Sequence, residues 1–195
     1  AKRTLSRSGL TYETPGGEEL SERLASVLEV VYLIFNEGYS ASRGEEWLRP
    51  QLCDEALRMG RVLVGLAPLE PEVHGLMALM DLNAARMHAR TDRDGEPILL
   101  MDQDRGLWDR LQITRGLRAL DRARELGGAG RFYTLQAAIV ACHATAETAA
   151  STDWRRIAEL YGQLATLVRS PVIELNRAVA LGMAEGPQAG LDLVE

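Results

Sequence analysis

The sequence has few of the features that mark secreted, membrane or metal-binding proteins. Its two cysteines, Cys53 and Cys142, lie far apart and form no Cys-x-x-Cys pair, so neither a disulfide framework nor a zinc knuckle is expected. No apolar run reaches the length that spans a membrane, and no signal peptide is visible. These absences predict a protein of the reducing cytoplasm that makes no membrane contact.

Lysine is almost absent as well. Lys2 is the only lysine, and all other basic residues are arginine, in a chain of net charge −6. An acidic chain is a poor ligand for nucleic acid, so no DNA contact is expected from these residues as a whole. We interpret the near-absence of lysine as a compositional bias, and arginine also favours fixed pairs with carboxylates.

Motifs for catalysis are also missing. The histidines His74, His88 and His143 form no His-Glu-x-x-His and have no second ligand at metal-binding spacing. No P-loop, dinucleotide fingerprint or Gly-x-Ser-x-Gly is found. We therefore expect no catalytic residue, no metal and no cofactor. His74, beside Gly75 in an apolar segment, is predicted to be a hydrogen-bonded core histidine.

What the sequence does have is apolar residues at helical spacing. The most apolar stretch runs from residue 30 to residue 42 and stops in Asn36-Glu37-Gly38-Tyr39. Its steps of three and four residues are the period of a buried helix face. We expect a helix over about 17–37 that ends at Gly38 in the left-handed cap that glycine adopts most easily. The same spacing, with proline and glycine stops, predicts further helices over about 45–66, 71–90, 102–126, 132–149, from 153, over 171–184 and from 187.

The start signals of the later helices differ in kind. Residues 91–101 are expected to form a loop whose end, 98–101, packs down as an extended segment. Asp102-Gln103-Asp104-Arg105 is expected to open the next helix, because acids at a helix start complement its dipole. Asp153 is an expected N-cap, and Pro171 is expected at the first helical position after Ser170.

Short connections between these helices predict an all-α fold, an antiparallel helix-pair array of about seven to eight helices. Trp154-x-x-Ile157-Ala158-x-x-Tyr161 resembles the first-helix pattern of tetratricopeptide repeats, which makes the array tetratricopeptide-like. The expected organisation is a polar linker over residues 1–19 and a helical domain over residues 20–195 that is cut at its C-terminal end.

An ordered set of motifs resembles a known domain. It comprises Val31-Tyr32-Leu33-Ile34-Phe35-Asn36-Glu37-Gly38-Tyr39-Ser40, Pro71-Glu72-Val73-His74-Gly75-Leu76-Met77-Ala78-Leu79-Met80, Asp102-Gln103-Asp104-Arg105 with Trp108-Asp109, Leu135-Gln136-Ala137-Ala138-Ile139, Thr152-Asp153-Trp154 and Leu175-Asn176-Arg177-Ala178-Val179. Together these resemble the tetratricopeptide-like C-terminal extension found in a subgroup of extracytoplasmic-function (ECF) sigma factors of RNA polymerase. The resemblance covers most of the chain.

The resemblance implies a longer parent protein in bacteria that takes part in transcription initiation. The parent would bind promoter DNA and core polymerase through two sigma regions that this chain lacks, with Ala1-Lys2-Arg3 as the end of region 4. Expected partners of the domain are the sigma regions of the same chain, the polymerase core, or both. The family's usual description includes no conventional anti-sigma partner, so the attached domain would itself regulate the sigma factor.

Polar side chains at helix ends are the candidate interaction groove. In helical repeats, a concave face of such residues binds a peptide. The alternative is that these side chains pair with one another and fix the helix ends. The candidates are Asn36, Glu37, Tyr39, Arg86, Asp102, Asp104, Arg105, Asn176 and Arg177.

Three functions follow, and the oligomeric state is left open. The first is a regulatory, protein-interaction domain of an ECF-type sigma factor. The second is a free-standing tetratricopeptide-like scaffold that binds peptides. The third is a hydrolase or small-molecule enzyme that uses Glu37, Asp102 and His74, which would require these residues to meet in one pocket with perturbed pKa values. No motif favours the third.

Overall fold

The computed structural model describes residues 17–40 and 48–194, and within these residues it is all α-helical apart from short 3-10 turns and loops. One isolated antiparallel bridge, between Thr91 and Pro97, is the sole β pairing in this part. The predicted all-α fold of about eight helices is confirmed. The helices are α2 (Gly17–Tyr39), α3 (Pro50–Leu66), α4 (Pro71–Ala84), α5 (Arg110–Glu125), α6 (Phe132–Thr145), α7 (Trp154–Leu167), α8 (Pro171–Glu185) and α9 (Pro187–Val194).

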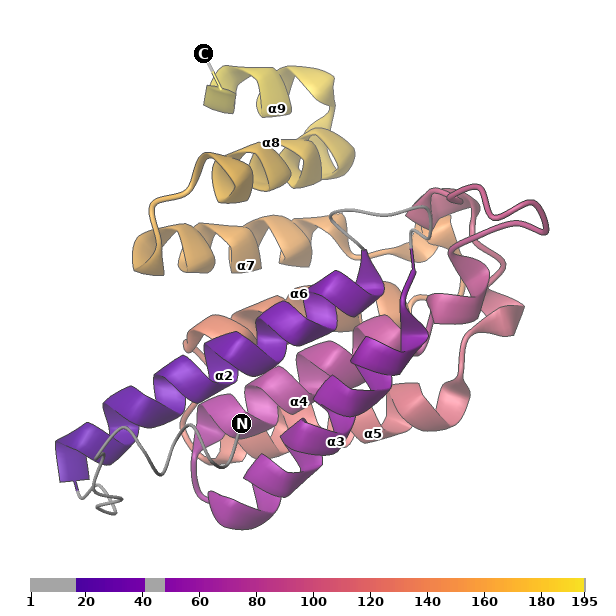
Figure 1. Cartoon of the computed structure of the whole chain (residues 1–195). Coiled ribbons are helices and arrows are strands. Elements are labelled where there is room, and N and C mark those ends of the chain that lie inside the picture. Colours follow the sequence, from indigo (N-terminus) through magenta and orange to yellow (C-terminus); the bar gives the residue numbers. More distant parts are fainter. Residues whose placement is uncertain (1–16, 41–47, 195) are drawn as a thin grey trace.

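Helix α4 is the centre of the molecule. It is apolar on all sides, as expected of a helix surrounded by others, and residues 73–82 are buried without interruption. Helices α2, α3, α5 and α6 pack around it, while α7, α8 and α9 stack one on the next beyond α6 (Figure 1). Successive helices run back and forth, so the chain combines a compact bundle with a short helical stack.

None of the helices in the described residues is long and apolar enough to cross a membrane. Residues 1–16 of the expected linker lie outside the described part, and residues 17–19 belong to α2. The predicted start of the second helix at residue 45 also lies outside it, and α3 begins at Pro50.

Gly38 does not form the predicted left-handed cap. Helix α2 runs through it to Tyr39, and the described glycines with positive φ are Gly95, Gly127 and Gly186. Gly38 is needed for a different reason. A Cβ at this position would lie 2.7 Å from the backbone nitrogen of Cys53 and 2.9 Å from the carbonyl oxygen of Arg49. Its missing side chain lets α3 begin directly against the end of α2.

Two of the predicted helix boundaries around the central loop are wrong. Helix α4 ends at Ala84 rather than at residue 90, and residues 87–89 form a 3-10 turn. Helix α5 begins at Arg110 rather than at Asp102, because the Asp109 side chain accepts a hydrogen bond from the backbone nitrogen of Gln112 at 2.9 Å and caps the helix. Residues 100–102 and 105–107 form separate 3-10 turns, so residues 98–101 are not fully extended.

Helix α6 also stops earlier than expected, at Thr145 rather than at residue 149. The carbonyl groups at its end accept hydrogen bonds from the side chain of Arg105. The predicted starts of the next two helices are confirmed. Asp153 caps α7 through the backbone nitrogen of Arg156 at 2.9 Å, and α8 starts with Pro171 at its first turn. Gly127, at φ +80°, ends α5.

Candidate functional site

A groove opens where the bundle meets the stack, between α2, α4, α6, α7 and α8. It encloses about 380 Å³, and the described residues that line it include no Asp, Glu, Lys, Arg or His. Charged residues make up 26% of the chain, so this neutrality is a property of the site. We call it the amide groove, and its lining is Tyr32, Leu79, Asn83, Phe132, Gln136, Ile139, Val140, Tyr161, Leu164, Val168, Ser170, Val172, Ile173 and Asn176.

Two carboxamides are held in place within the amide groove. The Oε1 atom of Gln136 accepts a hydrogen bond from the Tyr32 hydroxyl at 3.3 Å, which joins α6 to α2. The Nδ2 atom of Asn83 donates to the carbonyl oxygen of Leu79 at 3.0 Å. Burial raises the pKa of Tyr32, and the side chain of Asn36, one turn further along α2, opposes that rise.

Other polar groups of the amide groove have no internal partner. Neither the carboxamide of Asn176 nor the hydroxyl of Ser170 makes a side-chain hydrogen bond within the described residues. The Tyr161 hydroxyl is half-buried, and burial raises its pKa, so it stays protonated as a donor. These groups can donate to and accept from a bound polypeptide backbone without supplying a charge.

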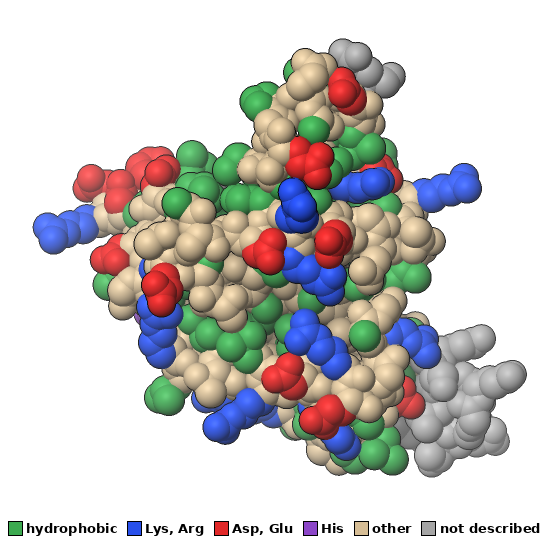
Figure 2. Space-filling model, turned by 180° about the vertical axis from the view of Figure 1, so that it is seen from behind, with side chains coloured by type: hydrophobic (Ala, Val, Ile, Leu, Met, Phe, Trp, Pro, Cys, Tyr) green, Lys and Arg blue, Asp and Glu red, His purple; other side chains and the backbone are tan. Residues whose placement is uncertain are grey.

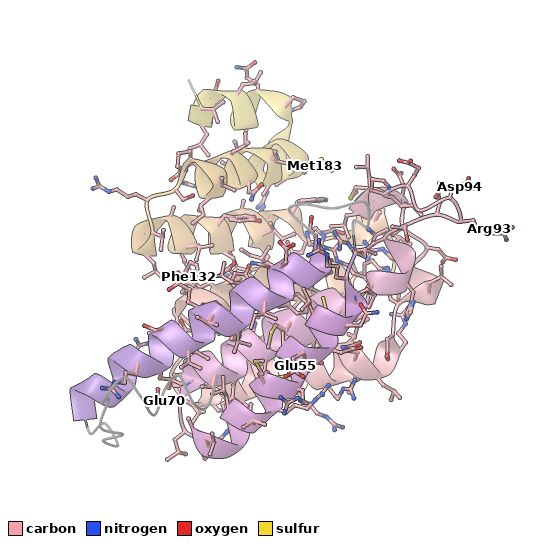
Figure 3. The ribbon with its side chains drawn as sticks, in the orientation of Figure 1. Glu55, Glu70, Arg93, Asp94, Phe132 and Met183 are labelled. Atoms are coloured by element: carbon pink, nitrogen blue, oxygen red, sulfur yellow. The ribbon has the colours of Figure 1, made fainter. Side chains whose placement is uncertain are left out.

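An apolar stripe of α8 extends the amide groove along the helix. Val172 and Asn176 line the groove, and Val179 and Met183 continue the same side of α8 at steps of three and four residues. Val172, Val179 and Met183 are 65%, 54% and 50% exposed. Met183 lies towards the far end of α8 from Pro171, and Phe132 marks the start of α6 below it (Figure 3). The stripe is open to solvent along its length.

Tyr39 and Arg86, two of the predicted site residues, meet in a second place at the ends of α2 and α4. The guanidinium carbon of Arg90 lies 3.6 Å from the centre of the Tyr39 ring, and that of Arg86 lies 5.6 Å from it. Arg90 Nη1 also donates to the carbonyl oxygen of Tyr39. Burial raises the pKa of Tyr39, while the two arginines oppose the rise. Sequence reasoning missed Arg90, because an arginine in the tail of an expected helix gives no sign of being buried.

Arg105 ties the central loop to the end of α6. Its Nη1 atom donates to the carbonyl oxygens of His143 at 2.6 Å and Ala146 at 2.9 Å, and its guanidinium lies 4.6 Å from the Trp108 ring. This is the contact that ends α6 early. His143 packs edge-on against Trp154 at 5.2 Å.

The environment of His143 is largely buried and positively charged. Burial first, and the nearby guanidinium groups of Arg86 and Arg105 second, lower the pKa of His143 to about 4. Several buried polar atoms here have no hydrogen-bond partner among the described residues, namely the Tyr39 hydroxyl, Arg86 Nε, Arg105 Nη2, Trp108 Nε1 and His143 Nδ1. The contacts of this cluster join the end of α2 to the residues that follow α4, and the central loop to the end of α6, while His143 reaches the start of α7.

The remaining predicted residues lie apart from both places. Glu37 pairs with Arg49 at 2.9 Å across the junction of α2 and α3. The Asp104 side chain accepts from the backbone nitrogen of Gly106 at 2.8 Å and so caps a 3-10 turn, while Asp102 is exposed. Arg177 pairs with Glu174 at 3.5 Å and faces α7 near Gly162, away from the amide groove. Asn176 and Arg177 are neighbours in the sequence, but their side chains lie on different sides of α8.

The trio of the enzyme hypothesis lies in separate surroundings. His74 is in the first turn of α4, and its Nε2 atom lies 2.9 Å from the carbonyl oxygen of Pro68, as predicted for a core histidine. Glu37 is near the other end of α4, paired with Arg49. Within residues 17–40 and 48–194, no group of three His, Cys, Asp or Glu side chains is arranged to hold a metal ion.

Acidic and basic side chains alternate over the back of the molecule, and hydrophobic side chains lie among them on the upper part formed by α8 and α9 (Figure 2). This face has no extended patch of one sign.

Comparison with known proteins gives a family but no activity. A family model described as a family of unknown function (DUF6596) matches residues 23–124. An uncharacterized protein of Rhizobium meliloti (strain 1021) is 48% identical over 195 residues, which is 100% of this chain and 46% of that protein. The chain thus spans less than half the length of this relative. No solved structure matches.

Proposed function

The chain belongs to the family of unknown function DUF6596, and from its amide groove we propose that it is a regulatory, protein-interaction domain of an ECF-type sigma factor. The groove binds a polypeptide segment of the sigma regions or of the polymerase core. The observation that carries this proposal is a concave, uncharged lining with a free carboxamide, at the junction of five helices.

The chemistry of the lining favours a polypeptide ligand. Small charged metabolites are recognised by fixed charges, and the described residues of this groove carry none. A peptide backbone carries one donor and one acceptor at each residue, and the Asn176 carboxamide supplies both complements. The exposed apolar stripe of α8 then offers contact area for aliphatic side chains.

The motifs that resemble the sigma-factor extension supply this same groove. Tyr32 comes from the first motif on α2, Gln136 from the motif on α6 and Asn176 from the motif on α8. Tyr32 and Gln136, which are 104 residues apart in the sequence, therefore meet where the proposed ligand binds. The relative of which this chain covers 46% has length to accommodate other regions, as a sigma factor with an attached domain would require.

A transcription assay with the full-length parent tests the proposal. The parent is compared with a version that ends after Arg7, on a promoter that the sigma factor recognises. The proposal expects promoter-specific transcription to rise or fall at least about fivefold, which corresponds to about 1 kcal/mol in the coupling between the domain and the sigma regions. Unchanged transcription would refute the regulatory function.

The second candidate is a free-standing peptide-binding scaffold, which is favoured by the sequential stacking of α7, α8 and α9. It predicts a partner that binds the chain when no sigma region is present. Unchanged transcription, together with loss of that partner in an Asn176→Arg variant, would favour the scaffold over the sigma-factor domain.

A further inference from the structure

A second and larger groove shares Tyr32 and Phe132 with the amide groove. It encloses about 780 Å³ between the middle of α2, the start of α4 and the start of α6. Glu70, just before α4, and Phe132, at the start of α6, both lie on the side of the molecule where α2 begins (Figure 3). We call it the aromatic groove, because the rings of Tyr32, Phe132 and Tyr133 line it.

The three rings of the aromatic groove meet at steep angles around Tyr133. The centre of the Tyr133 ring lies 5.5 Å from that of Tyr32, with 73° between the ring planes, and 5.2 Å from that of Phe132, with 72° between the planes. Tyr32 and Phe132 are half-buried, so part of each ring is open to the groove. Aromatic faces carry a negative potential that attracts cations, and rings set at an angle can act on one cation together.

The charge of the aromatic groove is also negative. The described residues of its lining carry three carboxylates, those of Glu29, Glu70 and Glu72, and one basic group, that of Arg131. Glu72 accepts a hydrogen bond from the backbone nitrogen of Tyr133 at 3.0 Å. Glu29 and Glu70 are exposed and make no ion pair within the described residues. A ligand with a positive charge is therefore favoured over an anion.

The Tyr133 hydroxyl adds a polar group at the bottom of the aromatic groove. Tyr133 is only 8% exposed, and its hydroxyl makes no hydrogen bond within the described part of the chain. Burial first, and the negative charge of Glu72 second, raise the pKa of Tyr133 to about 12. A positive charge nearby would offset the repulsion that these surroundings exert on negative charge.

We propose that the aromatic groove binds the alkylated ammonium group of an organic cation. Such a group has an apolar surface, which suits the rings and the half-buried Leu24 beside them, and it carries the charge that the carboxylates of the lining favour. A quaternary ammonium has no hydrogen to donate. It therefore needs ring faces and nearby negative charge, which this groove supplies, and no acceptor at a fixed distance.

Arg131 favours an alkylated ammonium over a guanidinium as the ligand. Its guanidinium is tethered in the lining, yet among the described residues the arginine–ring contacts fall on Tyr39 and Trp108 and on none of the three rings here. A guanidinium is bound best by two carboxylate oxygens in a fork. Glu29 and Glu70 are exposed side chains on different elements, and they act on the groove through their charge.

The binding of the cation does not depend on the proposed function, but its regulatory consequence does. Tyr32 and Phe132 line both grooves, so a cation against their rings contacts the wall of the amide groove. If the amide groove binds a polypeptide, the two ligands should change one another's affinity.

An NMR titration of the 195-residue chain with choline tests the proposal. The N-methyl protons of choline should shift upfield, because ring currents act on groups held over aromatic faces, with a Kd of about 1–5 mM. The matched ligand is 3,3-dimethylbutan-1-ol, which has the shape of choline and no charge. It should bind at least about tenfold more weakly.

Two variants locate the binding. Phe132→Leu removes one ring and keeps an apolar side chain, and it should weaken choline at least about fivefold. Glu29→Gln/Glu70→Gln changes exposed side chains only, so it should fold normally, and it should weaken choline at least about threefold. The matched control is Glu147→Gln, at an exposed glutamate after α6, which should bind choline like the wild type.

Three results would overturn the proposal: no shift of choline up to about 50 mM, equal binding of choline and its uncharged analogue, or wild-type binding by the Glu29→Gln/Glu70→Gln variant. A tripeptide with a trimethylated lysine between two glycines distinguishes the sources of the cation. Binding at least about tenfold tighter than choline supports a modified side chain of a partner, and equal or weaker binding supports a free small molecule. None of these results depends on transcription, so the cation site and the proposed function fail separately.

Discussion

Arg105 reaches across the loop before α5 and donates from Nη1 to the carbonyl oxygen of His143 at 2.6 Å. This one contact determines where α6 ends and fixes the loop that contains residues 100–108. The same nitrogen also donates to the carbonyl oxygen of Ala146 at 2.9 Å, one residue beyond the helix. A side chain 38 residues earlier in the chain thus supplies the C-terminal cap of α6.

Replacement of Arg105 by alanine is expected to lower the free energy of unfolding by about 2–3 kcal/mol, because two carbonyl groups lose a charged donor. Urea unfolding followed by circular dichroism measures the change. Arg110→Ala is the control, since Arg110 is exposed and contacts Arg105 through one long bond of 3.5 Å. Equal effects of the two substitutions would contradict the capping role.

Gly38 and Gly65 form a matched pair of helical glycines. A Cβ at Gly38 would lie 2.7 Å from the Cys53 nitrogen, whereas a Cβ at Gly65 meets nothing within 4 Å. Gly65→Ala should stabilise the protein by about 0.5–1 kcal/mol through helix propensity. Gly38→Ala should instead destabilise it by about 2 kcal/mol or more, because backbone atoms must move. Thermal unfolding of both variants measures the difference, and a stabilising Gly38→Ala would show that α3 does not approach so closely.

Asp109 and Asp102 test where α5 begins. Asp109→Ala removes the N-cap and should cost about 1 kcal/mol. Asp102→Ala, at the start predicted from the sequence, should change the free energy of unfolding by less than about 0.5 kcal/mol, because this residue is exposed and outside α5. Chemical denaturation of the two variants decides between the starts, and the reverse order of effects would place the helix start at Asp102.

The stability of the protein should depend on pH through His143. The pKa of this histidine is about 4 in the folded protein, against an ordinary value of 6.5, so the unfolded chain takes up a proton first as the pH falls. The contribution of neutral His143 is complete above about pH 6.5 and is lost on the way down to pH 4, by at most about 3 kcal/mol.

The measurement is the free energy of unfolding at several pH values for the wild type and for His143→Gln. The difference between the two proteins should shrink steadily from pH 7 to pH 4. His88→Gln, which alters an exposed histidine, should follow the wild type. A difference that does not change with pH would mean that His143 is not held neutral by its surroundings.

The helices were largely predictable because their signals are local. The apolar period, the proline starts at Pro71 and Pro171 and the glycine stop at Gly127 act within a few residues. The start of α5 was not predictable in this way, since Asp102 and Asp109 offer the same chemistry. What separates them is tertiary: Gln103 is buried and donates to the carbonyl oxygen of Ile98 at 3.1 Å, and Arg105 extends to α6.

The amide groove was predictable in part. Asn176 was noticeable because a carboxamide stands out in an apolar helix. Asn83 and Gln136 did not stand out in the sequence, because a single polar residue in a helix normally faces water. Their meeting depends on how α2, α4 and α6 pack, and that packing brings residues 104 apart in the sequence into contact at Tyr32 and Gln136. No local pattern contains this information.

The central claim is that the amide groove carries the regulatory contact, and one substitution tests it most directly. Asn176→Arg places a charge in a lining whose described residues carry none, and Asn176 is exposed, so the longer side chain has room. Promoter-specific transcription by the full-length parent with this substitution should change in the same direction as deletion of the domain, and by at least half as much on a logarithmic scale. Arg177→Gln, one residue away on the other side of α8, should leave transcription unchanged. Wild-type transcription with Asn176→Arg, under conditions where deletion of the domain has its effect, would contradict the account.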